Sequence, residues 1–361
     1  MQDLARPLYY ICLFFTFSLV FSSCADEVGR SLEAPATAFG KANEVAVVAD
    51  QALWEGTVGD TFRNYFGSAY LILPQPEPIF DLRHYTPEQL SEEPIRKELR
   101  TYILLGNVDD GNSATSRLIV NDIGSVNIEK SRSGEGYKTK VGRDKWAQGQ
   151  LLIYLYGFND ADLIENIRKN FPAASKRIND ADRKQIEAST FQAGENRTLA
   201  GEIQGKMGVN FRLPADYVAV IKEPDLVWLR KETDFASSNI MLHKIPYTDK
   251  SQLTKEGIKS IRDSLGRKYV STEIEGTYMR INDIDLPMFT KVIEVNNNYT
   301  LEARGIWEIV NDFMGGSFLS YLILNTEKNE LLFVDGFIHA PGKKKRERMQ
   351  RLELVLASIE F

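Results

Sequence analysis

The stretch "GIWEIVNDFMGGSFLSYLILN", from Gly305 to Asn325, decides the fold of the second half of the chain. Apolar residues alternate with period two on both sides of a polar break, which is the pattern of two neighbouring strands. After the break, apolar residues occupy both alternating sets: Phe318, Leu322 and Leu324 in one, Leu319, Tyr321 and Ile323 in the other. A strand that is apolar on both faces lies inside a sheet and is covered.

The break between these strands is the most distinctive motif and a candidate binding loop. It consists of Asn311, Asp312, Phe313, Met314, Gly315 and Gly316. The pattern favours a hairpin loop with a glycine bulge, because asparagine, aspartate and glycine suit turns and glycine tolerates positive φ. The alternative is an anion-binding nest of glycine amides, with Asp312 and Glu308 nearby as carboxylates.

The segments around this stretch predict an α+β fold. Four runs alternate with period two and are joined by short polar turns: "MFTKVIEVN", "YTLEARGIWEIV", "SFLSYLILN" and "ELLFVDGFIHA". A helical pattern follows Thr254, and another runs from Lys343 to Glu360 with apolar residues on one face. We therefore predict an antiparallel sheet meander with helices packed on one face.

The first half also mixes strands and helices, which predicts a second α+β domain. "NEVAVVAD" and "RTYILLGNVD" are typical of buried strands, and "DADLIENIRKNF" is typical of a helix. The polar, glycine-bearing segment 196–208 resembles a linker. The predicted domains are therefore residues 43–195 and 209–361, with residues 196–208 between them.

The N-terminus predicts a lipoprotein. The uncharged run from Leu8 to Phe21 is too short to span a bilayer but fits a signal peptide. Two serines and then Cys24 follow, which resembles a bacterial lipoprotein signal whose cysteine carries diacylglycerol and acyl chains such as palmitate. We predict a signal peptide at 1–23, lipidation at Cys24 and a flexible tether at 24–42. An ordinary secretory signal or an uncleaved anchor are the alternatives.

Composition limits the chemistry. The two cysteines, Cys12 and Cys24, leave no free thiol after cleavage and lipidation, so we expect no disulfide, thiolate metal site or cysteine nucleophile. The net charge of −6 argues against a nucleic-acid partner. His84, His243 and His339 lack metal-ligand spacing, so we predict no metal and no cofactor.

A basic run at the start of the last predicted helix is a candidate anion-binding surface. Its members are Lys343, Lys344, Lys345, Arg346 and Arg348. Cations at a helix N-terminus oppose the helix dipole, so their placement there needs a reason. A solvated helix face is favoured, and the alternative is contact with lipid phosphate or an acidic polysaccharide.

Three motifs carry a resemblance to a known family: "DKWAQGQ", "ARGIWEIVNDFMGG" and "VDGFIHAPGKKKRERMQRLE". Together they resemble a family of Bacteroidota envelope lipoproteins that is catalogued only as a domain of unknown function. The resemblance implies a lipid-anchored protein of the cell envelope and implies no catalytic residues. We predict that it lies at the outer membrane, on the periplasmic face or at the cell surface. We therefore predict a binding or interaction module with a protein or glycan partner. The alternative is an envelope hydrolase that acts on glycan or ester bonds.

Overall fold

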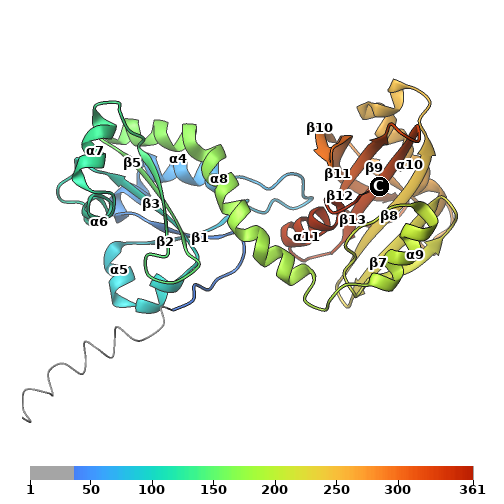
Figure 1. Ribbon diagram of the computed structural model, residues 1–361, viewed down its shortest axis with the longest axis horizontal. Helices are drawn as coiled ribbons and strands as arrows, with labels where there is room; N and C mark the ends of the chain where they lie inside the picture. The colour runs from blue at the N-terminus through green and yellow to red at the C-terminus, as the bar shows by residue number, and fades with distance from the viewer. Residues whose placement is uncertain (1–35, 361) are drawn as a thin grey trace, which may run out of the picture.

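The computed structural model describes residues 36–360, which form two domains joined by a long helix (Figure 1). The first domain contains β1 (Glu44–Val48), α3 (Gln51–Glu55), α4 (Thr57–Phe66), β2 (Asp81–Tyr85), α5 (Pro87–Glu92), the 3-10 helix η1 (Pro94–Glu98), β3 (Thr101–Asn107), α6 (Ala114–Ile123), α7 (Ser125–Arg132), β4 (Thr139–Arg143), β5 (Leu151–Gly157) and α8 (Asp160–Thr190). The second contains α9 (Arg197–Met207), β6 (Val218–Lys222), β7 (Leu226–Thr233), β8 (Ala236–Pro246), η2 (Lys250–Leu253), α10 (Lys255–Tyr269), β9 (Tyr278–Asn282), β10 (Phe289–Val295), β11 (Asn298–Val310), β12 (Gly315–Asn325), β13 (Glu330–His339) and α11 (Arg346–Leu356). Within this described part, no helix has the length and apolar character that crossing a membrane requires.

The first domain is built on a mostly parallel sheet. Its order is β2-β1-β3-β5-β4, and of the described strands β4 alone runs antiparallel to its neighbour. Helices α4 and α8 cover one face through residues such as Phe62 and Ile167. Helices α5, α6 and α7 cover the other face through Leu90, Ile119 and Ile128. Strands buried on both faces are apolar throughout, which explains the continuous apolar runs in β1, β3 and β5.

The second domain confirms the predicted antiparallel sheet. Its order is β10-β11-β12-β13-β8-β7-β6, and β9 pairs with the second half of β11. The covered strand is also confirmed, because Leu319 and Ile323 of β12 lie in one core and Phe318 and Leu322 lie in another. The helices cover both faces of this sheet instead of one: α9 and α11 pack on the first core, and α10 packs on the second.

The predicted linker 196–208 is a helix, so that prediction is wrong. Asn196 caps α9 by accepting a hydrogen bond from the amide of Leu199 over 3.1 Å. Leu199, Ile203 and Met207 recur on one face and are buried in the core of the second domain. Tertiary packing of this stripe outweighs the two exposed glycines that made the segment resemble a linker.

An arm of the first domain, residues 68–80 between α4 and β2, reaches into the second domain. Leu73 of this arm is buried among the core side chains that α9 and α11 cover, and Tyr70 packs against the same core. A reciprocal pair of amide hydrogen bonds, 2.8 and 2.9 Å long, joins Asn43 of the first domain to Gln350 of α11. The two domains therefore share a packed, hydrogen-bonded joint in addition to helix α8 (Figure 1).

Candidate functional site

The predicted binding loop is a tight hairpin between β11 and β12. Asn311 adopts a left-handed backbone with φ of 64°, and its side chain donates a hydrogen bond to the carbonyl of Gly276 over 3.3 Å. The amide of Ile309 donates to the carbonyl of Met314 over 2.8 Å and closes the loop. Phe313, at the tip, is fully exposed. The hairpin is confirmed, whereas the predicted bulge is wrong because the register of the two strands is continuous.

Gly315 and Gly316 lie inside strand β12 and not in the loop. A Cβ atom on Gly316 would meet the carbonyl oxygen of Ile338 at 1.9 Å, and one on Gly315 would meet that of Trp307 at 2.8 Å. Neither glycine has a positive φ. The alternative of a glycine nest is therefore wrong, and these glycines serve the close approach of neighbouring strands.

The predicted anion-binding run is divided by the fold. Lys345 and Arg346 are only 4% and 2% exposed, and both lie in the joint between the domains. Arg346 donates to the carboxylate of Asp81 over 2.6 Å, and the ammonium of Lys345 donates to Gln75 over 2.5 Å. Burial lowers the pKa of Lys345. These two residues cannot meet an external anion, so the prediction is wrong for them; Lys343 and Lys344 are exposed and Arg348 is half-buried.

Other predicted features are placed as follows. Cys24 and the signal peptide lie outside the described residues, as does most of the predicted tether. Thr37 and Phe39 pair with Gln148 and Leu99, so the prediction of a flexible tether is wrong for this part. His84 stacks on Trp54 with ring centroids 4.7 Å apart, and its Nε2 lies 2.9 Å from the carbonyl oxygen of Ala49. Burial lowers the pKa of His84. Between residues 36 and 360, no three His, Cys, Asp or Glu side chains come together as a metal site would require.

The carboxyl edge of the first sheet is filled by the chain itself. The connection after β1 leads to β2 on one side, and the connection after β3 leads to β4 on the other side. Ligands of comparable sheets bind between the ends of two such strands, here β1 and β3. Here Asp50, which follows β1, occupies that position. Its carboxylate accepts hydrogen bonds from the hydroxyl of Ser113, the N-cap of α6, and from the amide of Thr115 over 3.3 Å. The helix terminus that suits an anion is thus already paired.

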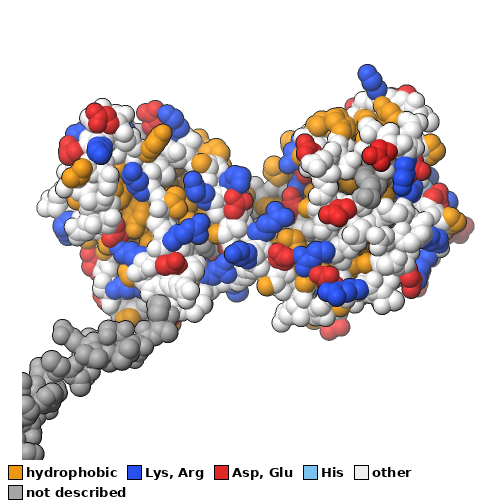
Figure 2. Space-filling model, viewed as in Figure 1, with side chains coloured by type: hydrophobic (Ala, Val, Ile, Leu, Met, Phe, Trp, Pro, Cys, Tyr) orange, Lys and Arg blue, Asp and Glu red, His pale blue; other side chains and the backbone are white. Residues whose placement is uncertain are grey.

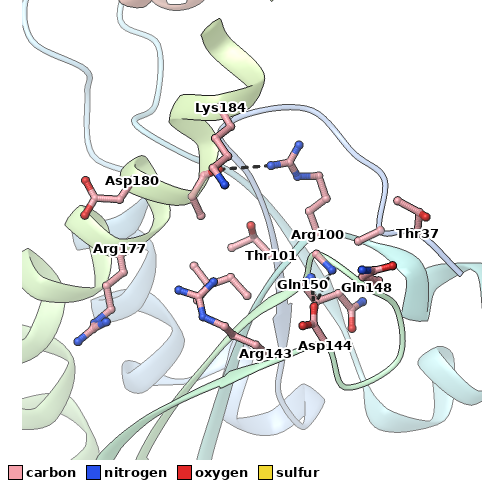
Figure 3. Close-up of a pocket in the computed structure, with 14 residues that line it drawn as sticks. Thr37, Arg100, Thr101, Arg143, Asp144, Gln148, Gln150, Arg177, Asp180 and Lys184 are labelled. Atoms are coloured by element: carbon pink, nitrogen blue, oxygen red, sulfur yellow. Dashed lines mark hydrogen bonds between the residues drawn. The ribbon is translucent and has the colours of Figure 1, made fainter. Parts of the chain in front are cut away.

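A hollow of about 660 Å³ lies at the opposite, amino-terminal edge of this sheet, next to α8 (Figure 3). Four cationic side chains line it, and we call it the basic hollow: Arg100, Arg143, Arg177 and Lys184. Arg100 immediately precedes β3, and Arg143 is the last residue of β4. Arg177 and Lys184 are seven residues apart on α8, so they share one helix face.

The rim of the basic hollow is the loop 144–150, which its own polar side chains hold in shape. The carboxylate of Asp144 accepts from the amide of Gly149 over 2.6 Å. The side chain of Gln150, which is 1% exposed, accepts from the amide of Trp146 over 2.9 Å and donates to the carbonyl of Leu99 over 2.7 Å. These bonds fix the loop against the start of β3, so the hollow has a preorganised wall.

The positive charge of the basic hollow is not neutralised by its own lining. Within residues 36–360, Arg143, Arg177 and Lys184 form no ion pair. Asp180 lies at the rim but points away from the hollow and pairs with Lys176 over 2.6 Å (Figure 3). Lys and Arg side chains also gather across the middle of the face seen in Figure 2, where the two lobes meet. The hollow therefore carries an excess of hydrogen-bond donors and positive charge.

Arg100 connects the basic hollow to the domain joint. Its guanidinium donates to Gln185 over 2.6 Å and lies 3.9 Å from the buried carboxylate of Asp182. Asp182 in turn accepts a hydrogen bond from the amide of Asn43 over 2.7 Å, and the side chain of Asn43 pairs with Gln350 of the second domain. Burial raises the pKa of Asp182, although Asn43 and Arg100 oppose that shift.

Comparison with known families places two regions of the chain. Residues 196–358 match the model of a domain of unknown function, DUF4837, and residues 38–191 match the model of another, DUF8532. The predicted resemblance to proteins catalogued as domains of unknown function is confirmed to this extent. The boundary between the two matches falls between α8 and α9. No curated protein matches the chain.

Solved structures show only distant likeness. The Ran-binding protein Mog1p of Saccharomyces cerevisiae is 13% identical, with 42% of this chain and 89% of that chain covered and a TM-score of 0.28. The human StarD13 lipid transfer and protein localization domain is 10% identical, with 45% and 95% covered and a TM-score of 0.21. Human STARD10 is 7% identical, with 45% and 74% covered and a TM-score of 0.20. Likeness at this level carries no argument about this chain.

The four cations of the basic hollow were not predicted from the sequence. They come from three separate segments: the start of β3, the end of β4 and the face of α8. No fixed spacing links them, so no motif could reveal them. One signal was present, because "DKWAQGQ" (residues 144–150) stood out as a family motif and forms the rim of the hollow.

Proposed function

We propose that the protein is a lipoprotein of the cell envelope, fastened to the outer membrane through acylated Cys24, and that it is a binding module. The lipoprotein-type signal before Cys24 and the polar tether after it support the anchor. The resemblance to Bacteroidota envelope lipoproteins supports the location. A cleaved, acylated chain would carry the two domains at the membrane surface on the segment between Cys24 and Thr37.

The ligand of this binding module is anionic and is held in the basic hollow. The observation that carries this proposal is the set of three cations, Arg143, Arg177 and Lys184, that lack ion pairs within residues 36–360 while they line one preorganised hollow. Positive charges without an anionic partner attract an anion that enters the hollow. Guanidinium groups also offer paired donors that match phosphate or carboxylate oxygens.

The anchor is tested by metabolic labelling of cells with a fatty acid that carries an alkyne. The wild-type chain is expected to take up the label and to lose residues 1–23, whereas Cys24→Ala takes up none. Cys12→Ala is the matched control, and it is expected to be labelled like the wild type. A mature wild-type protein without label would contradict the anchor and leave the ligand proposal standing.

The ligand is tested by thermal unfolding in the presence of inorganic pyrophosphate, a compact polyanion. The wild type is expected to show a rise in Tm that grows with pyrophosphate concentration, because a ligand that binds only the folded state stabilises it. Arg143→Gln combined with Lys184→Gln is expected to lose that rise. An equal rise in both proteins would assign the effect to some other surface and contradict the proposal.

A further inference from the structure

The chain enters the first domain at the basic hollow. The amide of Ala38 donates to the carbonyl of Gln148 over 2.9 Å, and the amide of Gln148 donates to the carbonyl of Ala36 over 2.8 Å. Thr37 and Ala38 therefore form part of the wall of the hollow. Cys24 precedes Thr37 by thirteen residues. A chain of that length spans at most about 45 Å, so an acyl group on Cys24 would keep the hollow near the bilayer.

The charges in the hollow indicate the class of anion. Of the four cations, Arg100 already lies beside the carboxylate of Asp182, which leaves Arg143, Arg177 and Lys184. Asp180 pairs with Lys176, so Asp144, which accepts backbone hydrogen bonds, is the lining carboxylate that offsets one of these three charges. One guanidinium is enough to neutralise a single carboxylate ligand. The remaining excess, spread over Arg143 and Lys184 from different elements, suits a group with several charged oxygens that reach in different directions. Phosphate is such a group.

We infer that the basic hollow binds the phosphate of an anionic lipid headgroup in the same bilayer that holds the acyl chains of Cys24. This inference rests on the anchor and the anionic ligand proposed above. A tether of this length gives an effective concentration of the order of millimolar, so even a weak headgroup site is occupied. Each cation that faces an anionic membrane strengthens binding about fivefold. The headgroup contact would orient the first domain on the membrane.

The test uses the chain from Ala25 to Phe361, which lacks the acylated cysteine and retains every described element and contact. Its binding is measured by flotation with vesicles of phosphatidylcholine alone and of phosphatidylcholine mixed with phosphatidylglycerol. The hollow variant is Arg143→Gln with Lys184→Gln. Neither side chain forms an ion pair within residues 36–360, so the two substitutions break no ion pair there that stabilises the fold. The matched control, Lys343→Gln with Lys344→Gln, removes the same charge from the exposed basic run of the second domain.

The wild type is expected to bind the vesicles that contain phosphatidylglycerol and to bind those of phosphatidylcholine much less. The hollow variant is expected to lose about 25-fold in affinity, while the control stays within about twofold of the wild type. Equal losses in the two variants, or a loss in the control alone, would overturn the inference. Circular dichroism of both variants verifies that the fold is intact.

A separate arm distinguishes a lipid from a free phosphate. Glycerol 3-phosphate is titrated into the same chain and observed by NMR or calorimetry. If it binds through Arg143 and Lys184 as tightly as the vesicles do, the ligand is a soluble phosphate and the lipid assignment is overturned. In that event the anionic ligand proposed above still stands. If the hollow variant keeps both the wild-type rise in Tm with pyrophosphate and the wild-type binding to vesicles, the ligand proposal itself fails.

Discussion

The carboxylate of Glu77 accepts a hydrogen bond from the amide of Lys345 over 2.5 Å and another from the amide of Arg346 over 3.2 Å. Glu77 lies on the arm of the first domain, and the two amides begin helix α11 of the second. A carboxylate at this position satisfies free helix amides and complements the helix dipole. The cap that α11 needs is therefore supplied by the other domain, since Lys345 offers no side-chain cap.

Replacement of Glu77 by Ala is expected to destabilise the protein by about 1–3 kcal/mol, because two buried amides lose their acceptor. Glu77→Gln is expected to cost less, since its amide oxygen still accepts one bond. Urea unfolding measures both. Glu135→Ala, at an exposed position, is the control and is expected to change little. Equal stability of Glu77→Ala and the wild type would show that solvent caps α11 equally well.

Asp182 is expected to make stability depend on pH. The side chain is 1% exposed, and burial raises the pKa of its carboxyl above the ordinary value of 3.8. Between 3.8 and the raised pKa the folded state binds more protons than the unfolded state. The contribution of Asp182 is therefore present at low pH and is lost as pH rises through its raised pKa.

Asp182→Asn keeps an acceptor for the amide of Asn43 without the charge. We expect this variant to be at least as stable as the wild type at neutral pH, with the difference shrinking as the pH falls toward 3.8. Urea unfolding at a series of pH values measures it. Asp180→Asn, two residues away and exposed, is expected to follow the wild-type profile. A variant that is less stable at pH 7 would show that the contact with Arg100 outweighs burial.

Two glycines are expected to respond in opposite ways to alanine. Gly316→Ala places a methyl group against the backbone of Ile338 and is expected to cost about 3 kcal/mol or more. Gly205 lies in helix α9 with nothing within 4 Å of an added Cβ. Gly205→Ala is therefore expected to stabilise the protein by about 0.5–1 kcal/mol through helix propensity. Thermal and urea unfolding compare the two, and a well-tolerated Gly316→Ala would refute the close strand contact.

A buried ion pair holds α10 to the second sheet. Nε of Arg262 lies 3.1 Å from Oδ1 of Asp335, and both side chains are at most 2% exposed. The guanidinium also lies over the ring of Phe318, 3.9 Å from its centroid. Arg262→Met is expected to cost about 3–5 kcal/mol, because it leaves the carboxylate buried and unpaired. Arg262→Met with Asp335→Asn is expected to cost less than Arg262→Met alone, and unfolding of the wild type and both variants in urea tests for that recovery.

Elements that local pattern determines were predictable from the sequence. Strands β10 to β13 were recognisable as apolar runs joined by short polar turns, and the two-sided apolar pattern of β12 correctly indicated a covered strand. Helix α9 was missed because glycines and polar residues dominate its sequence. Its three apolar residues stabilise a helix only when they pack against the second domain. Arg346 is buried beside Asp81, which lies 265 residues earlier in the chain. No local sequence pattern could predict this contact.

The basic hollow could not be predicted either, because it also depends on contacts between residues that are far apart in the sequence. Its cations are ordinary surface residues in the sequence. The sheet brings Arg100 and Arg143 to one edge, because β4 runs antiparallel to β5 and ends where β3 begins. Strand order and direction depend on pairing between distant strands, which periodicity does not reveal. The anion-binding surface was predicted instead at the basic run that begins at Lys343. Burial of Lys345 and Arg346 removes much of the charge of that run from the surface.

Leu73 belongs by sequence to the region that matches one family model, yet its side chain is buried in the interior of the region that matches the other. The core of residues 196–358 is therefore completed by a side chain from the first domain. Recombination that exchanged one of them for a diverged copy would leave an unfilled gap where Leu73 sits and would strip α11 of its acceptor. We expect the two regions to have been transmitted together and to have adjusted to each other residue by residue at this shared seam.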